Sequence, residues 1–390
     1  MEKIKLLFCH DRMVIGGTEK AFCEIADGLL KTGKYSISVW CKTPITEKYF
    51  LDFFEKHSIT LHQHLHDEAK HETLSKNIRR FFRRFINRYA NDRLFRRCVD
   101  GADVIVDFKN GCMQSRLRKV KDRPKIVWLQ CSSGVIIHDI KTDCSVYDKV
   151  VCISHCLRHD MQRYCPKLKD RLETIYLPFD LEHIRRLAEE EDHFSDHQLA
   201  LLGDDYFLVV TRLSRDKDSD TVILAYEMFL RETSSKTKLY FIGDGSDRLR
   251  LEQMAADCRL SEMILFLGQI SEPYAFVKHS KASILSSKNE GAPLVIVEGM
   301  ALKTIVVASD CPTAPRELLS DGRCGVLFTP GNAAELRDIL AKIDRREITK
   351  EQFSDDIDAW IKNFEKAPIL KQIQNTIDLL AANHTRNPDA

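Results

Sequence analysis

Two glutamates, Glu290 and Glu298, bracket the short apolar run of the stretch "EGAPLVIVE". Pro293 suits the first position of a helix, so the backbone N–H groups of residues 291–294 would be free to face an anion. Glu298 would lie about a turn and a half into that helix, where a carboxylate can bind a vicinal diol such as that of ribose. Glu290, in the preceding loop, would reach sugar hydroxyls. The alternative is a surface glutamate followed by a solvated helix face, and the stretch taken alone favours it.

A second chemical pair, Arg212 and Lys217, lies in the stretch "VVTRLSRDKDSDT", between an expected strand and an expected helix. Arginine binds phosphate in a bidentate manner, and lysine adds a compact positive charge. In a cleft the two side chains would neutralise a diphosphate. The alternative is a solvated charged loop, because Arg215 and three aspartates crowd the same stretch. Considered alone, the pair favours that alternative.

Glycines follow two expected strands. Gly16 and Gly17, in "VIGGTEKAF", would let the backbone approach a ligand at a helix N-terminus. A plain tight turn explains them equally well, and the G-x-G-x-x-G fingerprint of nicotinamide dinucleotide binding is missing. In "FIGDGSDRLRLE", Gly243 shapes a turn before a helix. The aspartates there suggest a metal, but we interpret Asp247 as a helix cap.

The composition is that of a globular protein, with 390 residues of which 44% are hydrophobic and 30% charged. This length predicts two domains. The sequence shows no apolar run near the roughly 18 residues of a spanning helix and no signal-peptide pattern. Thirteen scattered cysteines, with Cys152 and Cys156 flanking His155, lack a second metal-ligand pair and are interpreted as buried free thiols. These features predict an intracellular protein.

Apolar runs alternate with helical patterns, which is typical of parallel sheets flanked by helices. In the first half we predict strands at Ile4–Cys9, Ser36–Trp40, Val104–Asp107, Ile126–Gln130 and Lys149–Ile153, with helices at Gly17–Leu30 and from Ser154. After a link at 181–204, we predict strands at Tyr206–Thr211, Lys238–Gly243, Ile264–Leu267, Ala282–Ser286 and Thr304–Ser309. The helices expected there are Thr221–Arg231, Arg248–Cys258, Pro293–Leu302, Ala333–Ile343, 351–364 and 368–382. Doubly wound halves of this kind bind ligands at the carboxyl ends of their strands, so we expect the active site in a cleft between them.

Taken in order, the glycine turn, the Arg–Lys pair, the "GDG" turn and the E-x7-E stretch resemble the retaining family 4 glycosyltransferases of the GT-B fold. Many of these build bacterial lipopolysaccharide, capsule and other surface glycans. The resemblance is clearest over residues 206–330, and looser at "GGTE" and "YLPFD". It implies an α/β fold of the GT-B type, with two Rossmann-like doubly wound domains facing across a cleft. The implied domains are 1–180 on the acceptor side, 181–367 for the nucleotide-sugar donor, and 368–390 for a helix returning to the first domain and a tail.

The resemblance also implies roles for matching positions. Arg212 and Lys217 would hold the donor diphosphate, and Glu290 would contact the transferred sugar; these are the three predicted catalytic positions. Glu298 would bind the ribose, and the loop after Gly268 would border the base. The implied donor-binding set is Gly16, Gly17, Gly243, Gly268, Gly291, Ala292, Pro293, Leu294 and Glu298.

The implied reaction is retaining transfer of a hexose or N-acetylhexosamine from a nucleotide sugar, with UDP as the favoured base. The acceptor would be a saccharide, lipid-linked or part of lipopolysaccharide or capsule. No metal and no other cofactor is expected, because the charged groups and the helix N-terminus would stabilise the leaving diphosphate. The sequence departs from the family at Asp218, where glycine is frequent, at Leu177, where asparagine is frequent, and at Gln130, where several relatives have histidine. The role of Gln130 stays open. The alternatives are a catalytically silent glycosyltransferase-like subunit and another GT-B sugar-nucleotide enzyme such as an epimerase.

Residues 76–97 hold nine lysines and arginines and one aspartate, with aromatic and basic residues recurring at helical spacing. Residues 1–180 as a whole hold 33 basic and 23 acidic residues. A basic amphipathic helix of this kind can lie on an anionic membrane surface; the alternatives are an ordinary domain helix and, less favoured, nucleic-acid binding. The membrane-surface candidates are Arg79, Arg80, Arg83, Arg84 and Arg88. The predicted location is the cytoplasm, with peripheral association at the inner membrane as an open alternative.

Overall fold

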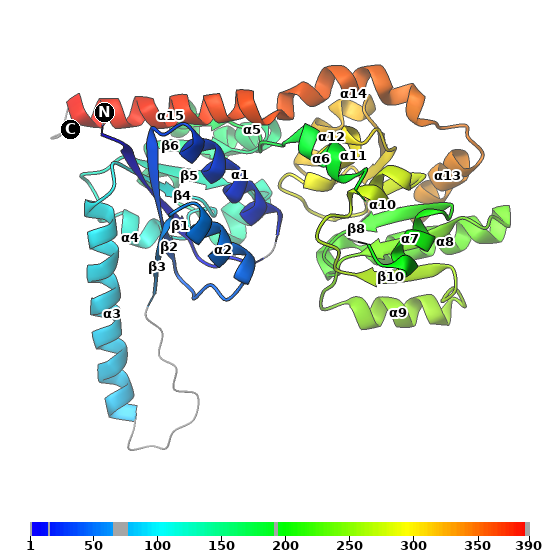
Figure 1. The fold of residues 1–390 in the computed structure, drawn as a ribbon, viewed down its shortest axis with the longest axis horizontal. Helices are drawn as coiled ribbons and strands as arrows, with labels where there is room; N and C mark the ends of the chain where they lie inside the picture. The colour runs from blue at the N-terminus through cyan, green and yellow to red at the C-terminus, as the bar shows by residue number, and fades with distance from the viewer. Residues whose placement is uncertain (1, 15, 65–76, 191–193, 387–390) are drawn as a thin grey trace. The chain divides into compact units, whose positions relative to one another are not determined.

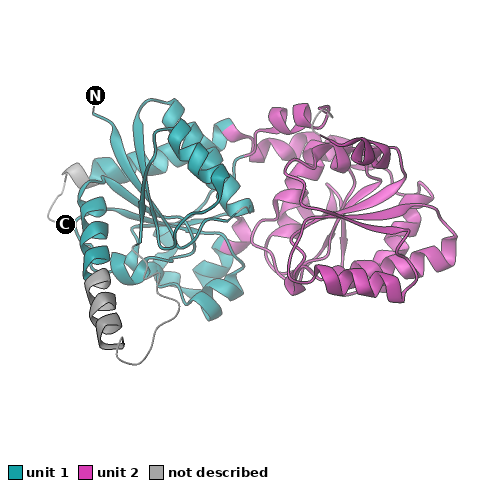
Figure 2. Ribbon diagram, turned by 60° about the horizontal axis from the view of Figure 1, so that its bottom comes forward, with its two compact units in different colours: residues 1–153, 158–178, 367–390 teal, residues 154–157, 179–366 magenta. Residues whose placement is uncertain are grey.

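The computed structural model describes residues 2–14, 16–64, 77–190 and 194–386, and only the backbone at 77–88 and 384–386. The chain forms two compact units (Figure 2). Unit 1 comprises Met1–Ile153, Arg158–Pro178 and Ala367–Ala390, and unit 2 comprises Ser154–Leu157 and Phe179–Lys366. Each unit has a parallel sheet covered by helices, which confirms the predicted α/β, doubly wound fold class (Figure 1).

The sheet of unit 1 has seven parallel strands in the order β3-β2-β1-β4-β5-β6-β7. Their bounds are β1 Ile4–His10, β2 Tyr35–Cys41, β3 Thr60–Gln63, β4 Val104–Asp107, β5 Lys125–Leu129, β6 Lys149–Cys152 and β7 Leu172–Thr174. All four residues of β4 and all five of β5 are buried. Continuous apolar runs of this kind form central parallel strands because helices cover both faces.

The helices of unit 1 are α1 Gly17–Lys31, α2 Lys48–Lys56, α3 Asn77–Asp100, α4 Gln114–Leu117, α5 His155–Tyr164 and α15 Lys366–Arg386. Helix α15 belongs to unit 1 from Ala367 onward, although residues Phe179–Lys366 lie in unit 2. Its Asp378 accepts a hydrogen bond from Tyr35 at 2.7 Å. A Cβ added at Gly28 of α1 would lie 2.2 Å from Leu370, so the two helices pack closely there.

The sheet of unit 2 has six parallel strands in the order β10-β9-β8-β11-β12-β13. Their bounds are β8 Tyr206–Val210, β9 Lys238–Ile242, β10 Ile264–Gly268, β11 Ala282–Leu285, β12 Val306–Ser309 and β13 Val326–Phe328. The helices are α6 Leu181–Leu187, α7 Asp196–Leu202, α8 Ser219–Thr233, α9 Arg248–Asp257, α10 Tyr274–His279, α11 Leu294–Ala301, α12 Ala314–Leu318, α13 Ala333–Asp344 and α14 Ser354–Trp360. The core on one side of the sheet combines Phe207 and Phe241 with side chains of α8, α9 and α13.

Gly243 and Gly245 stand where two loops of unit 2 meet. The φ angle of Gly243 is +129°, and a Cβ there would lie 1.9 Å from the carbonyl oxygen of Thr211. A Cβ at Gly245 would lie 2.2 Å from the carbonyl oxygen of Leu213. The loop after β8 and the turn after β9 are therefore held together by backbone contact that only glycine permits.

Replacement of Gly243 by alanine is expected to lower the free energy of unfolding by about 2 kcal/mol or more, because the backbone must move to relieve the clash. Urea denaturation checks this. Gly203→Ala is the matched control, since the nearest atom to a Cβ there lies 3.6 Å away. Equal stability of the two variants would contradict the packing argument.

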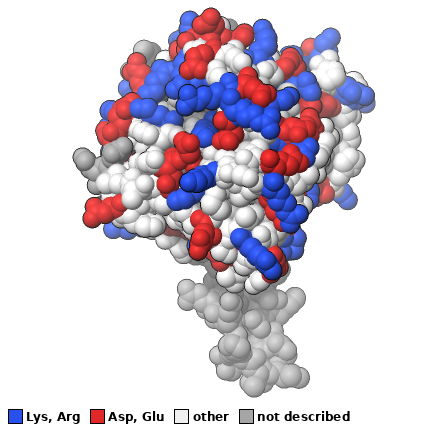
Figure 3. Space-filling model, turned by 90° about the vertical axis from the view of Figure 1, so that its right-hand side faces the viewer, with Lys and Arg blue, Asp and Glu red and all other residues white. Residues whose placement is uncertain are grey.

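Charged side chains of both signs are interspersed on the face that Figure 3 draws. Mixed charge of this kind is typical of a solvated surface. A nucleic-acid-binding face instead gathers basic residues along one stripe. This face therefore lends no support to the nucleic-acid alternative.

Candidate functional site

The loops after β8 and β11 lie at the point where the strand order of unit 2 reverses. Such a switch point is the usual ligand site of a doubly wound sheet. Lys217 lies in the loop after β8, and Glu290 lies in the loop after β11. The structure brings the two side chains together, with Nζ of Lys217 2.6 Å from Oε1 of Glu290.

This Lys217–Glu290 pair is largely buried, with side-chain exposures of 17% and 11%. The hydroxyl of Ser287 donates to the same Oε1 at 2.6 Å, and the hydroxyl of Ser286 donates to the carbonyl oxygen of Lys217 at 2.8 Å. The bonds to Glu290 are charge-assisted, and the neutral bond from Ser286 holds the backbone of Lys217. Because an ammonium has three N–H donors and Glu290 takes one, Lys217 retains donors for an anion.

Of the two residues predicted to bind the donor diphosphate, Arg212 and Lys217, Arg212 is the exposed one. Its charge acts on Asp216, which also accepts a hydrogen bond from Ser214 at 2.6 Å. Burial opposes the ionisation of Asp216, but the Ser214 hydrogen bond and the charges of Lys217 and Arg212 outweigh it and lower the pKa of Asp216. The Asp216 carboxylate is 52% exposed, so the hydrogen bond and the two cations of the loop act on a group that water also solvates.

Asp218, one of the departures from the family pattern, occupies the left-handed region with φ 52° and ψ 41°. Glycine adopts this region most easily, and aspartate is among the few other residues that tolerate it. The carboxylate of Asp218 accepts a hydrogen bond from Thr221 at 2.7 Å and lies 3.1 Å from Nζ of Lys288. The departure therefore preserves the loop conformation, and it adds two contacts.

Two substitutions of Asp218 distinguish the effect of its backbone conformation on stability from the effect of its carboxylate. Asp218→Gly is expected to change the free energy of unfolding by about 1 kcal/mol or less, because the easier backbone conformation offsets the lost contacts. Asp218→Val is expected to be less stable than Asp218→Gly by about 1–2 kcal/mol, since a β-branched residue is strained at this φ. Urea denaturation of both variants measures the difference; equal stabilities would contradict a conformational role for the position.

Helix α11 begins one residue later than expected. Pro293 is its N-cap, with φ −68° and ψ 112°, and Leu294 is its first residue; the expectation of Pro293 at the first helical position is wrong. The extended ψ of the N-cap turns the chain before the helix starts. Gly291 and Ala292 lead into this turn, and Glu298 lies partly buried just over one turn into the helix.

Thr313, which the sequence reasoning did not single out, holds the backbone of Glu290. Its φ is 90° and its ψ −107°, a rare conformation for a β-branched residue. Its hydroxyl donates to the carbonyl oxygen of Glu290, and the two residues form an isolated parallel bridge. Strain of this kind persists only where the surroundings enforce it, and it gathers at functional sites. The one signal in the sequence is the pair of prolines around Thr313, directly after β12.

The other predicted donor-binding glycines of unit 2, Gly243 and Gly268, lie at the carboxyl ends of its strands. The N–H of Gly243 donates to the carbonyl oxygen of Gly268 at 2.8 Å, so both lie where β9 and β10 end. Asp247 stands at the N-cap of α9, but its side chain makes no capping hydrogen bond, and the predicted cap is wrong. Its carboxylate instead lies 2.7 Å from Arg250 and 3.3 Å from Arg215. Two arginines outcompete the backbone N–H groups because a charged partner gives the stronger hydrogen bond.

Gly16 and Gly17 lie in unit 1, where Gly16 precedes α1 and Gly17 is its first residue. Gly16 is the N-cap of α1, with an extended backbone that any residue could adopt. A Cβ on Gly16 would lie 3.2 Å from Oε2 of Glu19. The carboxylate of Glu19 pairs with Nζ of Lys109 at 2.7 Å. The position is thus crowded rather than strained, beside a buried ion pair at the carboxyl edge of the sheet.

Gln130 directly follows β5 and is only 8% exposed. Its backbone N–H donates to Asn110 at 2.6 Å, and its side-chain N–H donates to the carbonyl oxygen of Phe108. Its side-chain oxygen has no partner among the described residues. A buried acceptor without a donor is costly, and this oxygen is closed to solvent in the structure.

His10 ends β1 and is fully buried against the rings of Phe22 and Phe108. Neither ring nitrogen has a hydrogen-bond partner within the described part of the chain. Burial, reinforced by the charge of Lys109 and opposed by Asp11, lowers the pKa of His10 to about 3. His10 is therefore neutral at any pH near neutrality.

The titration of His10 predicts a pH-dependent stability. His10 binds a proton near pH 6.5 in the unfolded chain but only near pH 3 in the folded chain. Below pH 6.5, protonation of the unfolded chain therefore lowers the free energy of unfolding. When the pH is lowered from 7.5 to 5.0, the free energy of unfolding of His10→Phe should rise by about 2 kcal/mol relative to that of the wild type. Urea denaturation at both pH values measures this. The comparison cancels the opposite titration of Asp107, whose pKa burial raises to about 6; a difference independent of pH would contradict a neutral His10.

The thirteen cysteines are all free, as expected; eight of them are buried, Cys152 included, and five, Cys156 included, are only partly buried. No group of three metal-ligating side chains occurs in the residues that the structure describes. Helix α3 confirms the helical character of the basic stretch. The side chains of its candidate membrane residues lie outside the described residues. Over the described ranges, no helix combines the length and the apolarity that crossing a membrane requires.

Residues 191–360 match the model of the glycosyl transferases group 1. Among curated proteins, the lipopolysaccharide 1,6-galactosyltransferase of Salmonella typhimurium is 28% identical over 152 residues, which cover 38% of this chain and 42% of that protein. The N-acetylgalactosamine-N,N'-diacetylbacillosaminyl-diphospho-undecaprenol 4-alpha-N-acetylgalactosaminyltransferase of Campylobacter jejuni is 25% identical over 52% of each chain. The matches thus span about two fifths to half of these relatives.

Solved structures are similar over nearly the whole chain. HepE of Anabaena in complex with UDP-glucose has a TM-score of 0.74 at 19% identity, covering 96% of this chain and 99% of that chain. The lipopolysaccharide outer core galactosyltransferase WaaB has a TM-score of 0.70 at 19% identity, with the same coverage. At these identities the likeness shows the fold.

Proposed function

This chain belongs to the GT-B glycosyltransferases of the group 1, family 4 type, and from that premise we propose that it transfers a sugar from a nucleotide sugar to a saccharide acceptor with retention of anomeric configuration. The observation that carries the proposal is the Lys217–Glu290 pair at the switch point of unit 2. In this account both residues are catalytic because they contact the donor: Lys217 at the diphosphate, Glu290 at the transferred sugar. The Salmonella and Campylobacter relatives, which are named as hexosyl and N-acetylhexosaminyl transferases, support a hexose or N-acetylhexosamine.

The donor diphosphate would lie between the loop after β8 and the start of α11. Arg212 would bind phosphate oxygens in a bidentate manner, and Lys217 would add a charge already fixed by Glu290. The first N–H groups of α11 point toward an anion at that end. As the glycosidic bond breaks, negative charge develops on the leaving diphosphate, and groups held in place beforehand stabilise it most. A diphosphate oxygen would take the proton of the acceptor hydroxyl, so these residues need no metal for the step.

The two oxygens of the Glu290 carboxylate have different roles in this proposal. One oxygen, Oε1, binds both Lys217 and Ser287, which leaves Oε2 for hydroxyls of the sugar. Thr313 fixes the backbone from the other side. We assign no charge or proton-transfer role to Gln130, because an amide does not titrate.

The nucleotide base of the donor and the class of the acceptor are proposed from the relatives rather than from the site. Uridine is favoured because HepE, similar in fold, binds UDP-glucose. A lipid-linked or lipopolysaccharide acceptor is favoured by the names of the Salmonella and Campylobacter relatives. Peripheral contact of α3 with the cytoplasmic face of a membrane would bring such acceptors close. Flotation with anionic liposomes tests that contact, and a protein that stays unbound would contradict it.

A transfer assay tests the proposed reaction. The wild type is incubated with UDP-sugars and oligosaccharide acceptors, and NMR determines the anomeric configuration of the product. An α-linked product from an α-linked donor supports retention, whereas a β-linked product contradicts it. An epimerised donor without transfer would favour the epimerase alternative. Donor binding without turnover would favour the silent subunit.

A further inference from the structure

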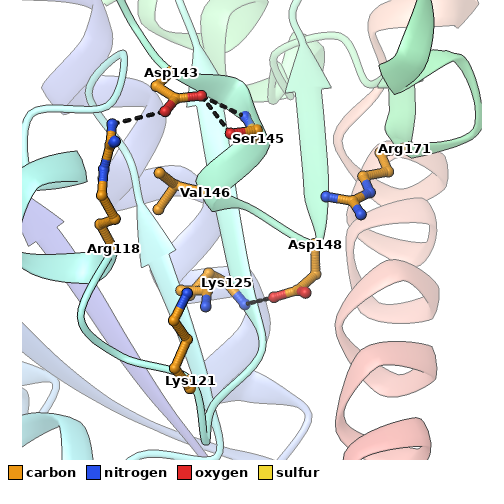
Figure 4. A pocket seen from close by; sticks show the side chains of 8 residues that line it. All are labelled: Arg118, Lys121, Lys125, Asp143, Ser145, Val146, Asp148 and Arg171. Carbon is orange, nitrogen blue, oxygen red and sulfur yellow. Dashed lines mark hydrogen bonds and ion pairs between the residues drawn. The ribbon is translucent and has the colours of Figure 1, made fainter. Parts of the chain in front are cut away.

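A second group of charged residues lies in unit 1, at the amino ends of β5, β6 and β7. It lines a pocket of about 320 Å³ (Figure 4). Lys125 is the first residue of β5, Asp148 precedes β6 and Arg171 precedes β7. The lining residues are Arg118, Lys121, Lys125, Asp143, Ser145, Val146, Asp148 and Arg171. Gly16 and Gln130 lie at the opposite, carboxyl edge of the sheet, so the proposed transfer reaction does not use this pocket.

The two carboxylates of the pocket are engaged by the protein. Asp143 accepts hydrogen bonds from the backbone N–H of Ser145 at 3.0 Å and from Arg118 at 2.7 Å. Its hydrogen bonds from Ser145 outweigh the effect of burial and lower its pKa. Asp148 accepts from the backbone N–H of Lys125 at 2.8 Å. These hydrogen bonds fix both carboxylates in place, and the negative charge of Asp148 also acts on Lys125.

Lys125 is only 7% exposed. Its ammonium donates to the carbonyl oxygen of Val120 at 2.8 Å, and within the described ranges it forms no ion pair, so two of its three N–H donors remain available. Burial lowers its pKa. Arg171 donates to the carbonyl oxygen of Tyr147 at 3.1 Å, and Lys121 is exposed at the rim. Among the described residues no carboxylate bonds directly to the ammonium of Lys125, so an anion that reached its two remaining N–H donors would lower the free energy cost of burying the charge.

We propose that this pocket binds the dianion of a phosphate monoester. Four cationic side chains face two carboxylates, so the pocket carries two excess positive charges, which equals the charge of the dianion. Lysine and arginine are the residues that bind phosphate oxygens best. Val146 is the one apolar side chain that lines the pocket in the described structure. A volume at the lower end of small-molecule sites leaves room for a phosphate and a small polar group.

Isothermal titration with methyl phosphate tests the pocket in the full chain. All proteins carry Arg212→Ala and Lys217→Ala, so phosphate affinity of unit 2 does not contribute. We expect the pocket variant Lys121→Glu/Arg171→Glu to bind at least about tenfold more weakly, because each charged hydrogen bond contributes a factor of ten or more. Lys121→Glu alone should weaken binding severalfold; Lys121 makes no hydrogen bond or ion pair to the described chain, so folding is not at stake. The matched control, Lys48→Glu/Lys56→Glu on α2, makes the same charge change outside the pocket and should leave binding within about twofold.

Vesicles with and without phosphatidic acid distinguish the two sources of such a phosphate. The same Arg212→Ala/Lys217→Ala background is used here. Sedimentation of the background protein with phosphatidic acid vesicles, lost in the pocket variant, supports the pocket with a lipid headgroup as its ligand. Methyl phosphate binding without sedimentation supports it with a soluble phosphate ester. Equal methyl phosphate affinities of the pocket variant and the α2 control would overturn the proposal, as would a background protein that binds neither methyl phosphate nor these vesicles.

Discussion

Replacement of Lys217 by alanine is expected to lower kcat/KM for sugar transfer by about 10²–10³-fold, the usual effect of removing one preorganised group that stabilises developing charge. The side chain is held 2.6 Å from Glu290 and is only 17% exposed, so no other cation can easily take its place. The loss should fall mainly on kcat, because the charge on the leaving diphosphate grows in the transition state. Initial rates of UDP release with saturating acceptor measure the effect.

Lys288→Ala is the matched control for Lys217. Lys288 lies on the same loop as Glu290 and pairs with Asp218, but its side chain is 59% exposed. Asp218 is only 6% exposed but keeps its hydrogen bond from Thr221 when Lys288 is removed, and the substitution should leave kcat/KM within a few-fold of the wild type. If Lys217→Ala were as active as Lys288→Ala, the assignment of Lys217 to the donor diphosphate would be wrong.

Replacement of Glu290 by alanine is expected to lower kcat/KM by about 10²-fold or more. The change removes the proposed contact with the transferred sugar, and it also releases Lys217 and Ser287 from their common partner. Charged hydrogen bonds contribute about 1.5–3 kcal/mol each, and two positioned groups depend on this carboxylate. Glu290→Gln keeps the shape but loses the charge, so its activity should lie between those of the wild type and Glu290→Ala.

Two comparisons sharpen the Glu290 experiment. Glu262→Ala, an exposed glutamate of unit 2, should retain full activity. The double variant Lys217→Ala/Glu290→Ala should lose less than the product of the single losses, because residues that act as a unit are not additive. Multiplicative losses would mean that the two side chains act independently, contrary to the 2.6 Å contact.

Much of the fold could be predicted from the sequence because central parallel strands are continuous apolar runs. Val104–Asp107 is predicted at its observed bounds, and Tyr206–Thr211 differs from β8 by one residue. The strands missed are β3, β7 and β13, which are three or four residues long and are edge strands of their sheets. Such strands have one neighbour or little burial, so their sequences, such as "TLHQ" of β3, show no strong pattern.

The sequence could predict those residues of the candidate site that directly follow predicted strands. Lys217 and Glu290 each follow a strand, and adjacent parallel strands bring their carboxyl ends to one edge. Two features depend instead on tertiary packing. The left-handed Asp218 has no signal beyond the family's preference for glycine, and the strained backbone of Thr313 is set by its contact with Glu290. The ion pairs of Asp247, which displaced the predicted cap, come from side chains elsewhere in the chain or one turn away.

The most direct test of the central claim is donor binding at the switch point of unit 2. Thermal unfolding of the wild type is measured with UDP-, GDP- and ADP-sugars. A ligand present at about 100 times its Kd stabilises the folded state by about 2.7 kcal/mol, so the account predicts a clear rise in Tm with at least one sugar nucleotide. It also predicts no rise for Arg212→Ala/Lys217→Ala with the same ligand. A wild type that no sugar nucleotide stabilises, or a double variant stabilised as much as the wild type, would contradict the account.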